Sequence, residues 1–450
     1  MRKNQEIVLS IKDLSSKGFG VGRAENGQAV FVAGAFAGDL VKVRLLKLKK
    51  SYAYAKIVQL IEPSADRLSA NDKKICPISV DCGGCQFQEL EYSAQLKYKE
   101  NLLKNAFSKI GNIENAPIFP IIAMQTPYDY RSKATFPIGM VKGKPAVGMY
   151  AYNSHRVVPV SHCNIQKPVC RSLIKAVSGL FSEIPVSVYD ETTHKGLLRH
   201  LVVRTGAEDV AVIFVINGTK LPDADKWISV LKNVLGENFS LIINANTSKT
   251  NVIFTDKFTI LHGSGYIYET VGHIKYRISH KSFFQVNPAQ AHRLFDIAAS
   301  HLDKDDRVLD AYSGIGAIAL YIAAKVREVV CIELIESAVE DGIFNANLNG
   351  ISNVSFELGA AEEIIPDILD RGFDAIILDP PRKGCDSKIL SSIIKQRIPK
   401  IIYVSCDPAT FARDIANLCE GGYSLEQVTP VDMFPMTRHV ESVGVLRLWR

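Results

Sequence analysis

Leu309-Asp-Ala-Tyr-Ser-Gly-Ile-Gly-Ala-Ile-Ala319 is the stretch of sequence that decides the fold of the C-terminal third. The apolar residues around Asp310 are typical of a buried strand. Gly314 and Gly316 then allow a tight turn into a helix and a close approach of the backbone to a ligand. By itself this turn also satisfies the Gly-x-Gly-x-x-Ala pattern of dinucleotide sites. Glu333 closes the next expected strand 17 residues after Gly316, where a carboxylate can accept hydrogen bonds from both ribose hydroxyls of an adenosyl group.

Strands and helices alternate from about residue 300 to the end of the chain. Expected strands cover 307–310, 328–333, 354–358, 373–379, 400–406, 425–433 and 442–449, and expected helices cover 315–324 and 337–348. This alternation predicts a doubly wound, Rossmann-like α/β domain. The ligand crevice of such a sheet lies beyond the carboxyl ends of its strands, so the strand-end residues should converge there. They are Asp310, Glu333, Asp379 and Cys406.

The first sixty residues are predicted to form a β-barrel, because short alternating runs are separated by glycine-bearing turns. The alternation within 40–50 slips at Leu45-Leu46 and resumes, as a β-bulge would make it do. These sixty residues hold 11 Lys/Arg and 4 Asp/Glu, a net charge of +7, whereas the other 390 hold 42 basic and 43 acidic residues, or −1. A basic barrel on a neutral body predicts a nucleic-acid-binding module, with Phe31, Tyr52 and Tyr54 as stacking platforms. A merely solvated lysine face is the alternative.

The composition excludes several classes of protein. With 450 residues, 47% hydrophobic and 22% charged, the chain is not disordered, and its length predicts two or three domains. No apolar run approaches the ~18 residues that a membrane span needs. The opening Met-Arg-Lys-Asn-Gln-Glu leads into no apolar stretch of signal length. We therefore expect a cytoplasmic, monomeric protein without a membrane partner.

Three of the nine cysteines, Cys76, Cys82 and Cys85, fall within ten residues. A reducing compartment does not favour disulfides, so this group predicts a metal site. The fourth thiolate would come from Cys163 or Cys170. Zinc and a four-iron cluster both accept four thiolates, but a zinc ribbon usually offers two Cys-x-x-Cys pairs, and the chain has one. The spacing therefore favours iron and sulfur over zinc.

Two motifs in the crevice favour S-adenosylmethionine over a nicotinamide. They are Asp379-Pro-Pro-Arg382 and Ser405-Cys-Asp-Pro408, and neither belongs to hydride chemistry. Carbon 5 of a pyrimidine is not nucleophilic, but a thiolate that adds to carbon 6 makes an enolate whose carbon 5 can attack a methylsulfonium. Cys406 precedes an expected helix start at Asp407-Pro408, and a helix N-terminus favours a thiolate. A buried, inert cysteine beside a proline turn is the alternative.

A base must then remove the proton from carbon 5. Glu441 is our candidate, because it opens the last strand on the side of the crevice, and His439 is its competitor. From the residues alone, an ordinary glutamate at a strand edge is equally compatible with this position.

Taken together, these motifs resemble those of the RNA uracil-5-methyltransferases over the whole chain. The matching segments are Ser282–Asn287, Asp310–Gly316, Asp379–Gly384, Ser405–Thr410 and Val431–Glu441. The resemblance implies that the barrel, 1–62, is a TRAM domain with an OB-like fold. We expect a central, mostly-β domain over 63–270 that holds the iron-sulfur cysteines and whose segment 91–124 packs on the catalytic domain. The S-adenosylmethionine-dependent catalytic domain is expected over 271–450.

The resemblance also implies roles for single residues. Cys406 is expected to be the nucleophile, Glu441 the base, and Asp379 a contact of both cofactor and target uracil. The expected cofactor-binding residues are Gln285, Tyr312, Gly314, Gly316, Glu333 and Asp379. Family members that act on ribosomal RNA carry a four-iron, four-sulfur cluster on this cysteine spacing. The resemblance thus implies a 4Fe-4S cluster on Cys76, Cys82, Cys85 and Cys163.

We therefore expect an enzyme that makes 5-methyluridine in RNA. The expected substrate is 23S ribosomal RNA, because relatives that act on bacterial transfer RNA generally lack the barrel and the cluster. Transfer RNA stays an alternative, since some archaeal relatives with the cysteines act on it. Two further hypotheses are a nucleobase amino-methyltransferase without covalent catalysis and an RNA-binding iron-sulfur assembly factor. In the middle region, Arg131 and Lys133 are expected to help hold RNA.

Overall fold

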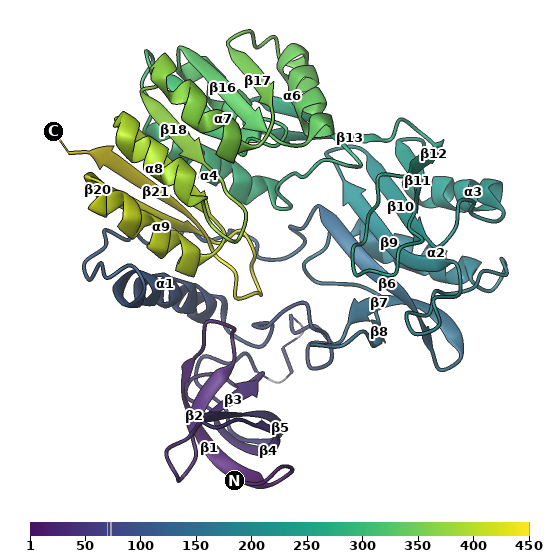
Figure 1. Cartoon of the computed structure of the whole chain (residues 1–450). Coiled ribbons are helices and arrows are strands. Elements are labelled where there is room, and N and C mark those ends of the chain that lie inside the picture. Colours follow the sequence, from purple (N-terminus) through teal and green to yellow (C-terminus); the bar gives the residue numbers. More distant parts are fainter. Residues whose placement is uncertain (70, 73, 450) are drawn as a thin grey trace.

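The computed structural model describes residues 1–69, 71, 72 and 74–449, and these form a barrel, two seven-stranded sheets and a two-stranded ribbon (Figure 1). Five strands close the barrel in the order β1-β2-β3-β5-β4. They are β1 (Glu6–Leu14), β2 (Gly20–Arg23), β3 (Ala29–Ala33), β4 (Leu40–Leu48) and β5 (Tyr52–Glu62). Val30, Val32, Val41 and Val43 are fully buried and alternate with more exposed residues, as expected of strands with one solvated face. The register of β4 on β5 shifts after Leu45, so the expected bulge is present.

The central sheet has the order β12-β11-β10-β9-β6-β7-β8. Its strands are β6 (Lys133–Val141), β7 (Lys144–Tyr150), β8 (Val157–Pro159), β9 (Leu198–Thr205), β10 (Val210–Ile216), β11 (Phe239–Ala245) and β12 (Phe258–His262). β10 and β11 pair in parallel through the connecting helix α3 (Ala224–Leu235), and the other described neighbours pair antiparallel. α3 buries Trp227, whose ring centre lies 4.8 Å from that of Phe214 on β10. Together with α2 (Val169–Leu180), α3 adds helices to a region for which the sequence suggested mostly strands.

A ribbon of β13 (Tyr266–Val271) and β14 (Ile274–Ser279) leads through α4 (Pro288–Ser300) into the C-terminal sheet. That sheet has the order β17-β16-β15-β18-β19-β21-β20. Its strands are β15 (Arg307–Ala311), β16 (Glu328–Glu333), β17 (Val354–Leu358), β18 (Ala375–Leu378), β19 (Lys400–Ser405), β20 (Tyr423–Val431) and β21 (Glu441–Leu448). Neighbours from β17 to β19 pair in parallel, and β21 runs antiparallel to both β19 and β20. The expectation of a doubly wound sheet is confirmed.

Helices cover both faces of the C-terminal sheet, because its strands are apolar on both sides. The helices that follow α4 are α5 (Ala317–Ile322), α6 (Glu336–Leu348), α7 (Ala361–Ile368), α8 (Ser387–Gln396) and α9 (Pro408–Glu420). Ile377 of β18 belongs to the apolar layer under α4, α5 and α6, and its neighbour Ile376 belongs to the layer under α7, α8 and α9. None of the described helices is long and apolar enough to cross a bilayer.

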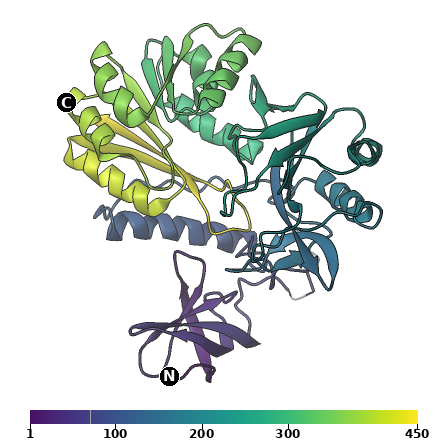
Figure 2. The same ribbon diagram turned by 45° about the vertical axis from the view of Figure 1, so that its right-hand side comes forward.

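Helix α1 (Tyr92–Lys109) precedes the central sheet in sequence but packs against the C-terminal sheet. The rings of Phe107 and Phe411, on α1 and α9, lie 5.4 Å apart and nearly perpendicular. The chain after α1 runs along β20, where the Phe119 N–H donates to the Val428 carbonyl at 2.8 Å. Figures 1 and 2 show α1 between the C-terminal sheet and the barrel. This helix therefore reaches both the barrel and the residues that follow β19 and β20.

Candidate functional site

The glycine turn after β15 contains three residues in the left-handed region, Tyr312 (φ 62°), Gly314 (φ 57°) and Gly316 (φ 69°). A Cβ on Gly316 would meet the Phe356 ring at 2.7 Å, whereas the space at Gly314 is open. Glycine is thus required at 316 by packing and at 314 by backbone conformation alone. The open side of Gly314 leaves room for a ligand to approach the backbone.

Glu333 ties the end of β16 to this turn. One carboxylate oxygen accepts a hydrogen bond from the Gly314 N–H at 2.9 Å, and the other accepts one from the Ile335 N–H at 2.8 Å. Each oxygen can accept a further hydrogen bond. The carboxylate is therefore held in a fixed orientation and can still bind a pair of ligand hydroxyls.

Asp310 and Asp379 place two carboxyl groups in the crevice whose charged forms are disfavoured. Asp310 is buried, and its Oδ2 has no hydrogen-bond partner among the described residues. Burial, followed by the charge of Asp379, raises the pKa of Asp310 well above its usual range. Burial also raises the pKa of Asp379, which follows β18, to about 7. A cation placed between these groups would relieve both penalties, so the residues fit a sulfonium cofactor.

Gln285 lies half-buried in the segment between β14 and α4. That segment is fixed by the Ser282 hydroxyl, which donates to Asp341 at 2.6 Å, and by Arg204, which donates to the Ser282 carbonyl at 2.7 Å. Phe283, in the same segment, is 69% exposed and was not among the predicted site residues. The sequence could have indicated this, because two consecutive phenylalanines in an extended segment point to opposite sides, and only one of them can be buried against the same layer.

Cys406 and Glu441 lie opposite each other at the end of neighbouring strands. Ser405 of β19 pairs with Ser442 of antiparallel β21, so the next residues in each direction are Cys406 and Glu441. Glu441 is buried, and burial followed by the charge of Asp379 raises its pKa well above the usual range. These two residues and Asp379 therefore come together at one point.

The sequence predicted that Cys406 would favour the thiolate form, but its surroundings in the structure favour the neutral thiol. The Asp407 side chain accepts hydrogen bonds from the N–H groups of Ala409 and Thr410, at 2.9 and 3.2 Å. These N–H groups of the first turn of α9 are therefore already paired. Burial, followed by the charges of Glu441 and Asp379, raises the pKa of the Cys406 thiol to about 11. The lowered thiol pKa that the sequence predicted is therefore not found, because burial and the neighbouring carboxylates raise it.

A cavity of ≈ 500 Å³ opens beside Cys406. Its walls come from three parts of the molecule: Arg382 and His439 from the C-terminal region, Ala106 and Lys109 from α1, and Lys17 from the barrel. Burial, followed by the charge of Arg438, lowers the pKa of His439 to about 4, so this imidazole is neutral near pH 7. The cavity thus combines the thiol with a neutral base and a cationic rim.

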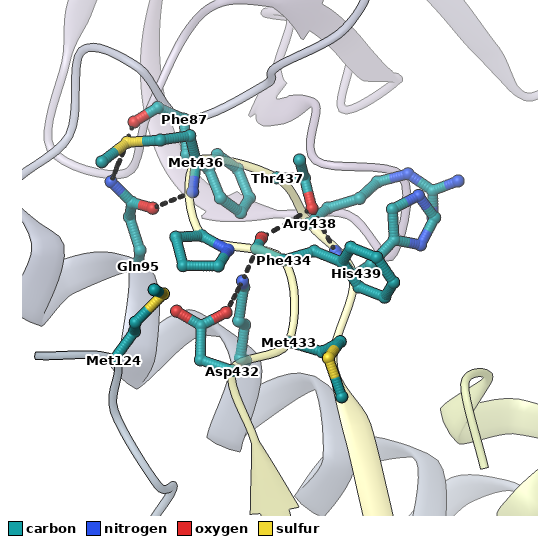
Figure 3. A network of polar contacts seen from close by, with 12 residues as sticks. Phe87, Gln95, Met124, Asp432, Met433, Phe434, Met436, Thr437, Arg438 and His439 are labelled. Atoms are coloured by element: carbon teal, nitrogen blue, oxygen red, sulfur yellow. Dashed lines mark hydrogen bonds and ion pairs between the residues drawn. The ribbon is translucent and has the colours of Figure 1, made fainter. Parts of the chain in front are cut away.

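The segment 432–440 between β20 and β21 is held by α1 and by the cysteine segment (Figure 3). Lys99 forms a buried ion pair with Asp432, with Nζ 2.5 Å from Oδ1. The Phe87 N–H, just after the cysteines, donates to the Met436 carbonyl at 3.0 Å. Arg438 donates to the Ser16 carbonyl of the barrel at 3.1 Å. No local sequence pattern predicted these contacts.

The cysteines predicted to bind a cluster lie in one neighbourhood. Cys85 and Cys163 pack with Tyr130 and Met436. Burial raises the pKa of Cys85 to about 12, and the charge of Cys163 comes next among the causes, followed by smaller contributions from Cys82 and Cys76. All nine cysteines lie in the described residues and are free thiols, and burial also raises the pKa of Cys170 to about 12.

The described residues nevertheless contain no group of three or more His, Cys, Asp or Glu side chains arranged to hold a metal ion. Four thiolates on one zinc ion would all lie about 2.3 Å from a single point. A four-iron cluster holds its thiolates farther apart, because iron and sulfide lie between them. The arrangement does not support a zinc site, and an iron-sulfur site is not shown.

The residues expected to bind RNA outside the crevice are partly engaged within the protein. Arg131 Nε donates to the Lys133 carbonyl at 3.0 Å, and the Lys133 ammonium lies 5.5 Å from the Phe254 ring centre. Burial lowers the pKa of Lys133 to about 8, and the charges of Arg204 and Arg131 contribute in the same direction.

On the barrel, the ring of Phe31 lies 5.6 Å from Tyr52 and 5.7 Å from Tyr54. Lys42 and Arg44 of β4 pair with Glu6 at 2.9 and 2.7 Å. The three aromatic rings therefore form one cluster, and part of the basic strand face is compensated.

Two family descriptions match this chain, and together they cover most of its length. The family description tRNA (uracil-5-)-methyltransferase matches residues 91–448, and the TRAM domain matches residues 2–58. An uncharacterized RNA methyltransferase of Halalkalibacterium halodurans is 40% identical over 454 residues, covering 100% of this chain and 98% of the relative. One of Clostridium tetani is 38% identical over 449 residues, covering 98% and 96%.

Among solved structures, the tRNA (uracil-54, C5)-methyltransferase of Pyrococcus abyssi in complex with S-adenosyl-L-homocysteine superposes with a TM-score of 0.78 at 26% identity. The match covers 98% of this chain and 100% of that protein. The C-terminal sheet thus has the fold of an S-adenosylmethionine-dependent methyltransferase, and the five-stranded barrel is a TRAM domain. The resemblance seen in the sequence is confirmed, and the chain belongs to the uracil-5 RNA methyltransferase family.

Proposed function

We propose that this protein transfers a methyl group from S-adenosylmethionine to carbon 5 of a uridine in RNA, through a temporary bond between Cys406 and carbon 6. The observation that carries this proposal is the position of Cys406 opposite Glu441, with Asp379 beside both. Asp379 also neighbours Asp310 at the glycine turn. A nucleophile, a base and a crevice suited to a cation thus lie at the same edge of the C-terminal sheet, where β18 and β19 end and β21 begins.

The proposed reaction has four steps. The Cys406 thiolate adds to carbon 6 of the uracil, and the ring electrons move to make an enolate. Carbon 5 then takes the methyl group as the methyl–sulfur bond of the sulfonium breaks, and neutral S-adenosylhomocysteine leaves. Glu441 removes the proton from carbon 5. The bond between carbon 6 and sulfur breaks last, which restores the thiolate and the aromatic ring.

Because the pKa of the Cys406 thiol is raised, the thiol must release its proton to solvent through the adjoining cavity before it adds to carbon 6. A cationic donor in the crevice favours the charged forms of Asp379, of the thiol and of Glu441, which must be a carboxylate to act as the base, because opposite charges stabilise each other in a desolvated site. We propose that Gln285, Tyr312, Gly314, Gly316, Glu333 and Asp379 bind the cofactor. The open face of Gly314 and the fixed carboxylate of Glu333 support this assignment.

RNA that contains 5-fluorouridine tests the covalent mechanism. Fluorine at carbon 5 blocks the elimination, so incubation with S-adenosylmethionine should trap protein on RNA as a band that survives denaturation. Cys406→Ala should abolish the band. Cys419→Ala, a partly buried thiol at the far end of α9, is the matched control and should not change it. A Cys406→Ala variant that still methylates RNA would favour amino-methylation without covalent catalysis.

We propose 23S ribosomal RNA as the substrate, and transfer RNA is the second candidate. The combination of a TRAM barrel with the cysteine segment supports ribosomal RNA through the family resemblance. The similarity to a Pyrococcus abyssi enzyme described as acting on tRNA supports the alternative. Mass-spectrometric mapping of 5-methyluridine in ribosomal and transfer RNA, from cells with and without the gene, should decide between them.

We also propose that Cys76, Cys82, Cys85 and Cys163 hold a four-iron, four-sulfur cluster that has a structural or RNA-positioning role. The mutual influence of these thiols on their pKa values supports the assignment. Protein purified without oxygen should contain four iron and four sulfide per chain. Cys163→Ala should lose this content, and Cys170→Ala should keep it. Equal iron in both variants, or none in the wild type, would contradict the assignment.

A further inference from the structure

Helix α1 places a lysine where charged side chains are rarely found. Lys99 is fully buried, and its ammonium donates to Asp432 Oδ1 at 2.5 Å and to the Phe434 carbonyl at 3.0 Å. Figure 3 labels the two acceptor residues, Asp432 and Phe434. Asp432 is also fully buried, and its Oδ2 accepts a hydrogen bond from the Tyr92 hydroxyl at 2.7 Å. Lysine and aspartate are almost never fully buried unless paired. Two residues of α1 thus each donate a hydrogen bond to one oxygen of the Asp432 carboxylate.

A pair of this kind is weak evidence for stability. Removal of two charges from water costs several kcal/mol per ion, and apolar replacements of whole buried pairs are often neutral. Such pairs can instead specify one conformation among several. The conformation concerned here is that of the segment 432–440, because Asp432 directly follows β20 and Glu441 begins β21.

The same segment is held at further points. Met436 has φ 66°, a left-handed conformation that a non-glycine residue adopts only when its surroundings impose it. The Gln95 side chain of α1 accepts from the Met436 N–H at 2.9 Å. Tyr130 donates to the Pro435 carbonyl at 3.0 Å, and Asn287 donates to the Met433 carbonyl at 3.0 Å. Contacts from outside therefore determine the path of this segment to Glu441.

We propose that Lys99 and Tyr92 are positioning residues that act through Asp432, and that they hold the segment 432–440 so that Glu441 meets the proton on carbon 5. This inference rests on the proposed function. It assigns α1 a role in one step of the reaction. Formation of the adduct depends on Cys406, which is carried by β19 and α9. Elimination depends on Glu441, whose place is set by the segment that α1 holds.

Loosening the segment should therefore slow elimination more than addition, and the methylated adduct should accumulate. A variant that is merely less stable lowers every step and accumulates nothing. The readout is the fraction of enzyme bonded to unsubstituted RNA during turnover, measured with labelled S-adenosylmethionine on denaturing gels. Glu441→Gln provides the reference, because it should stall after methyl transfer.

Two tyrosines of α1 form a matched pair for this test. Tyr92→Phe removes the hydroxyl that contacts Asp432, and Tyr98→Phe removes one that donates to the Ser15 carbonyl of the barrel at 2.7 Å. Tyr92→Phe should raise the adduct fraction several-fold over the wild type. Tyr98→Phe should leave it at the wild-type value. An equal adduct fraction in both variants would overturn the proposal.

Lys99→Met alone would leave a buried carboxylate without its cation and can fail to fold, so the double variant Lys99→Met with Asp432→Asn is the stronger test. It removes both charges at nearly constant volume and should approach the adduct fraction of Glu441→Gln. A double variant that folds and binds cofactor but accumulates no adduct would contradict the positioning role of Lys99 and Asp432. If Glu441→Gln itself accumulates none, the proposed function fails instead, and the two failures are thus distinguishable.

Discussion

The central and C-terminal sheets each have seven strands, and each contains parallel neighbours whose carboxyl ends lie side by side. In the central sheet, β10 and β11 are followed by Asn217 and Asn246. The buried Asn246 amide donates to the carbonyls of Val252 and Ile253 at 2.7 and 2.9 Å. Asn217 donates to the Gly196 carbonyl at 3.0 Å. These strand-end amides are occupied in holding nearby loops.

The equivalent positions of the C-terminal sheet keep unused capacity. Asp310 Oδ2 has no partner among the described residues, and the pKa values of Asp379 and Cys406 are raised chiefly by burial. Two sheets of the same size thus differ in whether their strand ends are satisfied by the protein itself. Unsatisfied strand ends are where a ligand or substrate can bind, and the raised pKa values of Asp310, Asp379 and Cys406 lie together at this edge of the C-terminal sheet.

The largest effect is expected for Cys406→Ala. This change removes the group proposed to bond to carbon 6, so formation of 5-methyluridine should fall by about 10⁴-fold or more. Single-turnover assays with saturating RNA and cofactor would measure the loss. Cofactor affinity should change little, because the thiol does not bind the adenosyl group. Retention of more than a tenth of the wild-type rate would contradict a covalent mechanism through Cys406.

Asp310→Asn probes the unsatisfied carboxylate directly. The substitution removes the carboxyl group that can become charged beside a cationic ligand, and hydrogen bonds to charged groups contribute about 1.5–3 kcal/mol, so affinity for S-adenosylmethionine should fall roughly 10- to 100-fold. Titration calorimetry would measure this. The melting temperature of the ligand-free protein should not drop, because burial already disfavours the charged form of Asp310 and asparagine resembles the neutral form. A lower melting temperature with unchanged affinity would place Asp310 with the satisfied residues of the central sheet.

Asn246→Ala tests the opposite case in the central sheet. It leaves the carbonyls of Val252 and Ile253 without their donor, and the free energy of unfolding should fall by about 1–3 kcal/mol. Chemical denaturation followed by tryptophan fluorescence would show the change, because Trp227 lies in this region. Affinity for S-adenosylmethionine should stay at the wild-type value. A large loss of affinity would show that the comparison between the sheets is drawn too sharply.

The smallest effect is a pH dependence of stability. Burial raises the pKa of Asp379 from an ordinary value of 3.8 to about 7, so the folded protein holds a proton that the unfolded chain has released between these values. The contribution of Asp379 to stability is present below pH 4 and is lost as the pH rises towards 7. The ligand-free protein should therefore melt at a lower temperature at pH 8 than at pH 6. Asp379→Asn should weaken this dependence, and an unchanged dependence would contradict the raised pKa.

The C-terminal sheet could be predicted closely from the sequence because parallel strands buried on both faces appear as continuous apolar runs. The expected strand 354–358 coincides with β17, and β19 ends one residue before the predicted Cys406. Helices α2 and α3 were missed. In α3, the β-branched Ile228, Val230 and Val234 favour a strand locally, and packing of Trp227 on Phe214 decides for a helix.

The strand-end residues of the site could be predicted for the same reason, since topology alone brings them to one edge. The residues that hold the segment 432–440 could not. Lys99 and Asp432 are 333 positions apart, and no local pattern links them. The pKa of Cys406 also depends on Glu441 and Asp379, which come from other strands. Local sequence therefore predicted which strand-end groups come together, but not the environment that sets their pKa values.

Helix α1 decides how small a working version of this protein can be made. A fragment that began at residue 271 would retain every strand of the C-terminal sheet, yet Asp432 would lose Lys99 and the apolar face of α9 around Phe411 would lose Phe107. Such a truncated chain should be insoluble or unfolded. The shortest autonomous catalytic unit must therefore start before Tyr92, and it has to carry along the central sheet that lies between α1 and β15.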